Sequence, residues 1–315
     1  MPPAISIVSP IFNMQDYLKR FLIAILSQTF TDFELICVND GSTDNSATII
    51  QDYAKHDKRI RLINLKQNSG FGKAMNLGIA YAKGQTLCFA DPDDLLPANS
   101  LELRWQALHK YHAVVRSCHE EFNPNGILLN HERRPPNLPE VFCPKDVALT
   151  LKVTNLTHVH WTWLFPMDLV KKSHSQFLEG SRVAADTMFL CQIFFHIDRC
   201  VWIPDLTYFY MRRKNSTEDI KYSAQDYIDA LKSSDYFLAQ SQKYNCIELG
   251  DMFFNMQCDY LLTSLFKNML PEITTVLQYI FQIDDKYKIY QRHHDPKTYS
   301  GLSALKHLRP GFQWN

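Results

Sequence analysis

The chain has 315 residues, of which 46% are hydrophobic, and its 33 basic residues balance its 33 acidic residues. This composition excludes a chain that is disordered throughout, and the zero net charge gives no support for a nucleic-acid partner. The length suffices for one large α/β domain with an appendage, or for two modest domains.

Strand and helix patterns alternate along the first part of the chain. Apolar runs predict strands at 5–8, 33–38, 60–65 and 86–90. The alternation predicts an α/β fold whose mostly parallel sheet is flanked by helices. Because the carboxyl ends of parallel strands meet at one edge, residues 10–13, 39–40 and 91–94 are expected to lie together.

The later elements follow a less regular pattern. Pro97 is expected in the first turn of a helix that carries Leu101 and Trp105. Beyond it we expect a strand, a loop or hairpin, a helix and an extended segment, at 113–118, 119–143, 183–197 and 201–212. From about residue 218 the sequence predicts long amphipathic helices, which are candidates for a homodimer contact.

The cysteines and the N-terminus bear on the compartment. The eight cysteines form no CxxC pair, and Cys37 and Cys88 fall inside apolar runs, where reduced and buried thiols are expected. The N-terminus lacks a signal-peptide pattern, and no stretch reaches the roughly 18 apolar residues of a membrane span. We therefore expect a cytoplasmic protein, either soluble or peripheral at the inner face of the cell membrane.

Three carboxylates lie within four positions after the fourth predicted strand, at Asp91, Asp93 and Asp94. They repel one another unless they are solvated or a cation binds. Hard oxygen ligands on a short turn suit Mg²⁺ or Mn²⁺, especially when a substrate diphosphate supplies further oxygens. The alternative interpretation is an ordinary turn with acidic residues at a helix start.

Asp40 ends another buried strand at the same expected edge. A carboxylate in this place can accept the N–H of a uracil ring. The alternative is again a structural turn, because the sequence Asn-Asp-Gly-Ser at 39–42 is well suited to one.

Five segments, taken in order, resemble the signature of family 2 glycosyltransferases. They are 9–13, 28–30, 38–44, 68–78 and 89–94, which read SPIFN, QTF, VNDGSTD, NSGFGKAMNLG and FADPDD. The resemblance covers roughly residues 4–217. It implies a GT-A domain at 1–217, with a nucleotide-binding half at 1–100 and an acceptor half at 101–217, followed by a helical C-terminal region at 218–315.

The same resemblance implies the reaction and the roles of particular residues. Inverting enzymes of this family transfer a hexose or N-acetylhexosamine from a UDP-sugar to a glycan or lipid-linked acceptor, often in bacterial lipopolysaccharide or capsule synthesis. Asp40 would hold the base, Asp91 would approach the ribose and the donor sugar, and Asp93 of the DxD motif would bind Mn²⁺ or Mg²⁺. The remaining positions implied for the nucleotide-sugar are Pro10, Phe12, Asn13, Asn68, Gly70 and Lys73.

The resemblance also implies a catalytic base. The family places an acidic pair at the start of a helix about ninety residues after the DxD turn, and Asp186 matches the second acid while Ala185 replaces the first. Asp186 is therefore the expected base, with Glu179 as the alternative. Arg212 belongs to a run at 208–216 that resembles an aromatic-basic tail closing over the donor phosphates, although a solvated basic loop is an equal interpretation.

Two further groups have weaker signals. His158, His160, Trp161 and Trp163 are expected on a strand, either lining the acceptor site or, for the tryptophans, packing in the core. Two histidines without a third ligand are poor evidence for zinc. The basic and aromatic residues of the C-terminal tail suit an anionic membrane surface, but an ordinary solvated tail is the alternative.

Other functions fit less well. A dinucleotide-dependent oxidoreductase would need GxGxxG after the first strand, where this chain has no glycine. A catalytically inactive sugar-nucleotide or glycan-binding module of the same fold stays open, because Met75, Trp163 and Ala185 stand where the family usually has Arg, Lys and an acid.

Overall fold

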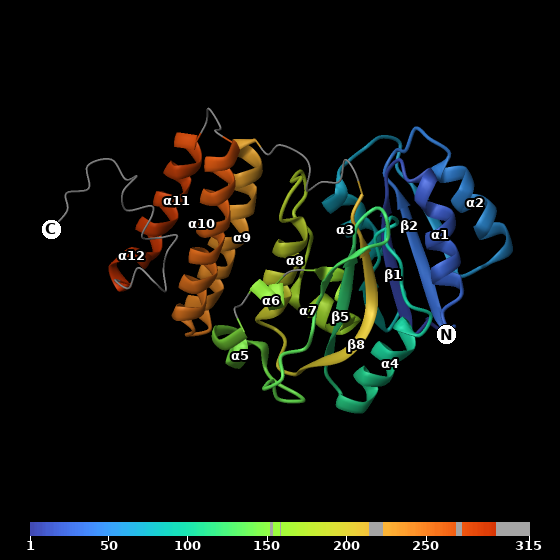
Figure 1. Cartoon of the computed structure of the whole chain (residues 1–315), viewed down its shortest axis with the longest axis horizontal. Helices are drawn as coiled ribbons and strands as arrows, with labels where there is room; N and C mark the ends of the chain where they lie inside the picture. The colour runs from blue at the N-terminus through green and yellow to red at the C-terminus, as the bar shows by residue number, and fades with distance from the viewer. Residues whose placement is uncertain (152–153, 158, 214–222, 269–272, 294–315) are drawn as a thin grey trace.

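The computed structural model describes residues 1–151, 154–157, 159–213, 223–268 and 273–293. An α/β half built around one sheet lies beside a bundle of long helices (Figure 1). The expected boundary at residue 217 lies outside the described residues.

Four parallel strands form the first part of the sheet, in the order β3-β2-β1-β4. They are β1 (Ile5–Ile11), β2 (Phe33–Asn39), β3 (Ile60–Asn64) and β4 (Thr86–Phe89). The helices between them are α1 (Gln15–Leu26), α2 (Ser46–His56) and α3 (Phe71–Tyr81). Strands β2 and β4 are buried along their whole length, as expected of parallel strands covered on both faces.

The second part of the sheet is mixed. It continues in the order β4-β7-β5-β6, with β8 paired to β5. Its strands are β5 (Val114–Phe122), β6 (Leu128–His131), β7 (Trp163–Pro166) and β8 (Cys200–Met211). Strand β7 runs antiparallel to both β4 and β5, whereas β8 runs parallel to β5. The short strand β7 therefore joins the two halves of the sheet.

Helices and one 3₁₀ turn connect these strands. They are α4 (Ser100–Tyr111), α5 (Pro144–Leu151), α6 (Thr154–Thr157), η1 (His160–Thr162), α7 (Met167–Ser173) and α8 (Ala185–Phe194). The hairpin expected within 119–143 is present as β5 and β6, which pair antiparallel.

Three predicted boundaries were wrong. Helix α4 begins at Ser100, and Pro97 lies in a turn before it, where its carbonyl accepts from the Ser100 N–H at 2.9 Å and from the Gln28 side chain at 2.8 Å. Helix α8 begins at Ala185 because Ala184 has a left-handed φ of 56°, which a right-handed helix cannot include. His160 lies in the turn η1 and not on a strand, since β7 begins only at Trp163.

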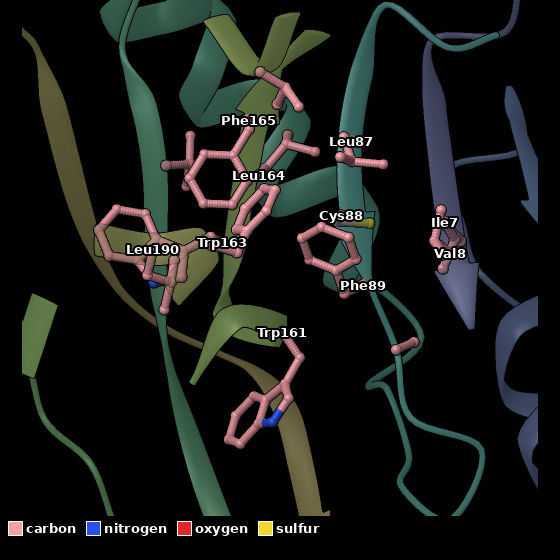
Figure 2. Close-up of a cluster of buried hydrophobic side chains, with 14 of the residues drawn as sticks. Ile7, Val8, Leu87, Cys88, Phe89, Trp161, Trp163, Leu164, Phe165 and Leu190 are labelled. Atoms are coloured by element: carbon pink, nitrogen blue, oxygen red, sulfur yellow. The ribbon is translucent and has the colours of Figure 1, made fainter. Parts of the chain in front are cut away.

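Aromatic rings fill the junction between β4 and the acceptor half (Figure 2). Phe89 of β4 lies edge-on to Phe177 and Phe189, with ring centroids 5.2 and 5.3 Å away. Trp163 stacks against Phe165 at 5.6 Å and is only 1% exposed. This packing fixes β7 against the parallel strands, so the two halves meet through a rigid apolar layer.

The C-terminal region is helical, as predicted, and its helices pack into a bundle. They are α9 (Ala224–Lys243), α10 (Ile247–Asn268), α11 (Ile273–Tyr287) and α12 (Ile289–Arg292). Helices α9, α10 and α11 lie side by side (Figure 1) around a second apolar core that contains Leu231, Phe254 and Ile280. Phe237 of α9 contacts Phe194 of α8 at 5.4 Å, so the bundle is attached to the acceptor half.

Two expectations drawn from composition can be compared with the structure. All eight cysteines are free thiols, and Cys37 and Cys88 are buried as predicted. Among the described residues, no helix has the length and apolar character to cross a membrane. Residues 294–315, which hold most of the basic and aromatic tail, lie outside the described residues.

Candidate functional site

The acidic turn after β4 is held in place by β8. Asp94 is fully buried, and its carboxylate accepts hydrogen bonds from the Tyr208 hydroxyl and the Met211 backbone N–H, both at 2.8 Å. The Asp91 N–H in turn donates to the Tyr208 oxygen at 3.0 Å. Burial, together with the neighbouring charges of Asp93 and Asp91, raises the pKa of Asp94 well above its ordinary value. Asp94 is therefore the acid that fixes this turn.

Asp93 faces a positive charge. Its carboxylate forms an ion pair with Arg213 Nε at 2.5 Å, and its backbone carbonyl accepts from Arg20 Nη2, also at 2.5 Å. The Arg213 guanidinium lies 5.8 Å from the centre of the Tyr17 ring. Arginines from α1 and from the end of β8 thus converge on the DxD turn.

Asp91 interacts electrostatically with acidic residues from both halves of the α/β domain, Asp93 and Asp186. Its pKa is raised to about 6, first by burial and then by the negative charges of Asp93 and Asp186, while His160 and Arg213 oppose the rise. These interactions require Asp186, from helix α8, to lie within electrostatic reach of Asp91 at the end of β4. Asp91 is therefore within electrostatic reach of both the expected metal ligand, Asp93, and the expected base, Asp186.

Asp186 lies in the first turn of α8, next to the left-handed Ala184. Its Oδ1 accepts from the Thr187 N–H at 2.8 Å, and its Oδ2 lies 3.6 Å from Nδ1 of His160. The alternative base, Glu179, is exposed and accepts a hydrogen bond from Asn76 of α3 at 3.1 Å. Glu179 therefore has a contact that ties its loop to α3.

Asp40 organises the loop that leads into α3. It is 3% exposed, and its two carboxylate oxygens accept from the backbone N–H groups of Ser69 (2.7 Å) and Gly70 (2.8 Å). Gly70 has a φ of +92°, in the region that favours glycine. Each carboxylate oxygen has a further lone pair, so the structural role and the expected contact with a base are compatible.

The other residues expected along the nucleotide surround this loop. Pro10 is half-buried near the end of β1, whereas Phe12 is 40% exposed in the loop that follows. The Asn13 side chain accepts a hydrogen bond from the Thr43 N–H at 2.9 Å, which joins the loops after β1 and β2. Asn68 and Lys73 are exposed before and within the first turn of α3.

Arg212, the arginine expected over the phosphates, points elsewhere. Its guanidinium pairs with Glu121 of β5, and its backbone N–H donates to the Phe122 carbonyl at 2.9 Å. The neighbouring Arg213 is the one beside Asp93, and sequence reasoning missed it. In a strand, alternate side chains point to the same face, so a longer β8 would have placed Arg212 on the same face as Tyr208. Strand β8 ends at Met211, however, and the alternation does not extend to Arg212.

The described aromatic side chains at positions 160–163 lie in the hydrophobic core. Trp161 stacks on Tyr208 with ring centroids 4.1 Å apart and is 6% exposed, and Trp163 is more deeply buried still. Figure 2 shows Trp163 beside Phe165 and Trp161 farther from that cluster. Burial favours packing over acceptor lining for both tryptophans. His160 is 3% exposed, and His158 lies outside the described residues.

Asp91 and Asp93 could supply some, but not all, of the oxygen ligands that a divalent ion needs. Within the described residues, no three His, Cys, Asp or Glu side chains form a preformed metal site. Asp91 and Asp93 nevertheless offer hard oxygens at a place where negative charge accumulates, and Arg213 supplies positive charge to it. This donor set suits Mg²⁺ or Mn²⁺ if further oxygens come from a bound diphosphate.

Residues 6–171, more than half of the chain, match the family model described as glycosyl transferase family 2. The chain belongs to this family. Among curated relatives, the uncharacterized glycosyltransferase EpsJ of Bacillus subtilis is 28% identical over 230 residues, which cover 70% of this chain and 65% of EpsJ. Glycosyltransferase GlyG of Streptococcus pneumoniae is 29% identical over 258 residues, which cover 76% of this chain and 82% of GlyG.

Solved structures share the fold of this family member. TarS of S. aureus, residues 1–349 in complex with UDP, matches with a TM-score of 0.77 and 19% identity, covering 96% of this chain and 87% of that one. A mannosyltransferase from Pyrobaculum calidifontis in complex with GDP-Man and Mn²⁺ matches with a TM-score of 0.55 and 15% identity, covering 97% and 86%. The GT-A fold with additional C-terminal helices, predicted from the sequence, is confirmed.

Proposed function

We propose that this family 2 glycosyltransferase moves a hexose or N-acetylhexosamine from a UDP-sugar to a hydroxyl of a glycan or lipid-linked acceptor, with inversion. The observation that supports the proposal is that the charges of Asp93, on the DxD turn, and Asp186, at the start of α8, both act on Asp91 at the end of β4. A single displacement needs a base beside the acceptor and positive charge at the leaving phosphate. The edge of the sheet where β4 ends offers candidates for both tasks.

UDP is the donor nucleotide that we propose. Asp40 ends β2 at the same edge and keeps acceptor capacity for the N–H of uracil. TarS, which has the same fold, was crystallised with UDP and with UDP-GlcNAc, and this supports a uridine nucleotide. The Asn13, Asp40 and Gly70 loops would enclose its nucleoside.

Mn²⁺ or Mg²⁺ is the proposed cofactor. Asp93 would hold the ion, with Asp91 beside it and the diphosphate completing its oxygen ligands. When bound, the ion would act as a Lewis acid that stabilises the departing diphosphate. Arg213 would add a fixed positive charge to the same place.

Asp186 is the proposed base. Its Oδ1 accepts a hydrogen bond from the backbone N–H of Thr187, which holds the side chain at the start of α8, and the carboxylate would take the proton of the acceptor hydroxyl. Ala185 stands where the family resemblance implies the first acid of a pair, so Asp186 would act as the only carboxylate of that pair. The partly exposed Asp186 side chain lies where an acceptor can reach it, since 33% of its surface is open.

The product that we propose is a bacterial surface glycan such as a lipopolysaccharide outer core or a capsule. Contact with an anionic membrane and dimerisation through the C-terminal helices are further proposals.

Two basic residues of the C-terminal region already form ion pairs within the protein: Lys286 with Asp235 at 2.7 Å and Arg292 with Asp251 at 2.5 Å. A membrane contact would therefore depend on the tail beyond residue 293.

A screen of UDP-sugars tests the function. The protein is incubated with Mn²⁺ and each UDP-sugar in turn, and released UDP is measured before and after EDTA. We expect slow hydrolysis of one or two donors, abolished by EDTA and lowered at least about 100-fold by Asp93→Asn. The control variant Asp52→Asn, at an exposed helical position, should retain wild-type turnover.

The screen also separates the enzyme from a binding module. A protein that takes up UDP with Mn²⁺ but releases none from any UDP-sugar would support the inactive sugar-nucleotide-binding alternative. UDP uptake that is indifferent to EDTA and to Asp93→Asn would contradict the proposed metal site.

A further inference from the structure

The hydroxyl of Tyr208, on β8, binds both ends of the DxD turn. It donates to Asp94 Oδ2 at 2.8 Å and accepts from the backbone N–H of Asp91 at 3.0 Å. The turn is closed between the same two residues, because the Asp94 N–H donates to the Asp91 carbonyl at 3.2 Å. Tyr208 is fully buried, so the loss of its hydroxyl would leave buried polar groups unpaired. One oxygen atom therefore joins the two ends of the turn that carries Asp93.

The acceptor half holds the Tyr208 ring in place. The Trp161 ring stacks on it, with centroids 4.1 Å apart and an interplanar angle of 15°. His119 of β5 meets the Trp161 ring edge-on at 4.8 Å, and the buried guanidinium of Arg104, on α4, donates to the Trp161 carbonyl at 3.3 Å. Elements η1, β5 and α4 therefore fix the ring whose hydroxyl reaches the DxD turn. Trp161 thus contributes to the site by packing on Tyr208.

The end of β8 is also joined to the DxD turn through its backbone. Phe209 and Leu95 exchange two hydrogen bonds, of 2.9 and 3.1 Å, directly after the turn. Farther along the chain, Arg213 pairs with Asp93. These contacts keep β8 beside the turn by themselves, so the Tyr208 hydroxyl is not needed merely to join the two segments.

Packing does not explain the hydroxyl either. A phenylalanine at position 208 would fill the same space and stack on Trp161 in the same way, but it would leave the Asp91 N–H without this acceptor. Hydrogen bonds that orient the ligands of a metal ion from outside commonly determine how tightly the ion is held. The hydroxyl is placed to do this for the DxD turn.

We propose that Tyr208 is a positioning residue for the carboxylates of the DxD turn. Its hydroxyl sets the separation of Asp91 from Asp94, and thereby the direction in which Asp91 and Asp93 would present their oxygens to Mn²⁺ and the donor diphosphate. Tyr208 acts through the turn and contacts neither group. This role rests on the proposed function, because it assumes that Asp93 holds the metal ion.

The Mn²⁺ dependence of UDP binding tests this role. The Kd for UDP is measured by calorimetric titration of the full-length protein at a series of free Mn²⁺ concentrations, for wild type and for Tyr208→Phe. We expect Tyr208→Phe to need about 10-fold more Mn²⁺ for half of the gain in UDP affinity, because its metal ligands are less well oriented. UDP release from the best donor of the screen should shift in the same way, and excess Mn²⁺ should restore most of the turnover.

Thr207→Val is the matched control. Thr207 is the preceding residue of β8 and is equally buried, and its hydroxyl lies 2.5 Å from that of Ser117, on the opposite face of the strand from Tyr208. Each variant removes one buried hydroxyl, so both should lower the melting temperature. Only Tyr208→Phe should shift the Mn²⁺ dependence. Trp161→Phe, which keeps the Tyr208 hydroxyl but reduces the stacking, should shift it in the same direction by a smaller factor.

The outcomes distinguish the two levels of the proposal. An unchanged Mn²⁺ dependence in Tyr208→Phe, or an equal shift in Thr207→Val, would show that the hydroxyl only stabilises the fold, and the proposed function would stand without the positioning role. If UDP binding by Asp93→Asn responds to Mn²⁺ as it does in wild type, the proposed metal site itself is wrong. If Tyr208→Phe does not fold, Trp161→Phe replaces it and must show a shift that Thr207→Val lacks.

Discussion

Arg212 and Arg213 are neighbours in the sequence but serve different acids. Arg212 extends from the end of β8 toward Glu121 on β5, whereas Arg213 turns back to Asp93. Of the two, Arg213 is the one beside Asp93, the residue proposed to hold the metal ion and, through it, the diphosphate. The pKa of Arg213 is raised, because the hydrogen bond and the charge of Asp93 outweigh its partial burial. The guanidinium is therefore charged at neutral pH.

This difference predicts unequal effects of the two arginines. Arg213→Ala should weaken the binding of UDP with Mn²⁺ by about 10-fold, since it removes a charge-assisted contact and leaves the acids without their cation. Arg212→Ala is the matched control and should change the Kd less than twofold. Calorimetric titration with UDP provides the measurement, and equal losses in both variants would show that the pairing with Asp93 is irrelevant to the nucleotide.

The positions of the candidate site residues were predictable only where the motif stands at the end of a predicted strand. Asp40, Asp91 and Asp93 stand at strand ends, so their shared edge followed from the parallel sheet. Partners supplied by tertiary structure were not predictable. The clamp of Tyr208 on Asp94 joins positions 114 residues apart, and no local pattern marks it. The contact of His160 with Asp186 depends in the same way on where the turn η1 and helix α8 meet.

Among the elements, the parallel strands were predicted well because each is an apolar run with its own stop signal. The acceptor half was predicted less well because its boundaries depend on contacts. Gly72 shows this at α3, where a Cβ would lie 2.3 Å from the Leu178 carbonyl oxygen of a distant loop. The Asn76 side-chain amide holds the same loop: its Oδ1 accepts from the Phe177 N–H at 2.8 Å, and its Nδ2 donates to the Phe177 carbonyl at 2.9 Å. Helix α3 thereby sets the path of the chain toward Asp186.

Glu34 performs a comparable task at the opposite end of β2. Its Oε1 accepts from Ser6 Oγ at 2.7 Å and from Lys83 N at 2.6 Å, and its Oε2 pairs with Arg61 at 2.5 Å. Burial alone would raise the pKa of Glu34, but these donors and the charge of Arg61 outweigh it, so the pKa is lowered from 4.5. The ionised carboxylate thus stabilises the folded state.

The lowered pKa predicts a pH dependence of stability. The contribution of Glu34 is present above pH 4.5, its unfolded value, and is lost as the pH falls through the lower folded value. Glu34→Gln should therefore cost about 1–3 kcal/mol of unfolding free energy at pH 7, and the difference from wild type should shrink as the pH falls below about 4.5. Denaturant unfolding at several pH values measures it. A difference that stays constant with pH would contradict the assigned ionisation.

At the scale of the whole molecule, one ion pair links the C-terminal bundle to the acceptor loop. Arg182, in the loop before α8, pairs through both Nε and Nη2 with Asp226 in the first turn of α9, where the Nε contact is 3.0 Å. Asp226 also accepts from Ser223 N at 2.7 Å and completes a capping box with it. The start of the bundle is therefore joined to the segment that leads into Asp186.

This link predicts that the bundle affects turnover. Arg182→Gln leaves the capping box intact, so it should lower the unfolding free energy by only about 1 kcal/mol, because Arg182 is half exposed. The same variant should slow UDP release several-fold, since the loop before Asp186 loses its anchor. Lys232→Gln removes a pair within α9 alone and is the matched control. Equal turnover in the two variants would mean that the bundle is a separate unit whose packing leaves the base undisturbed.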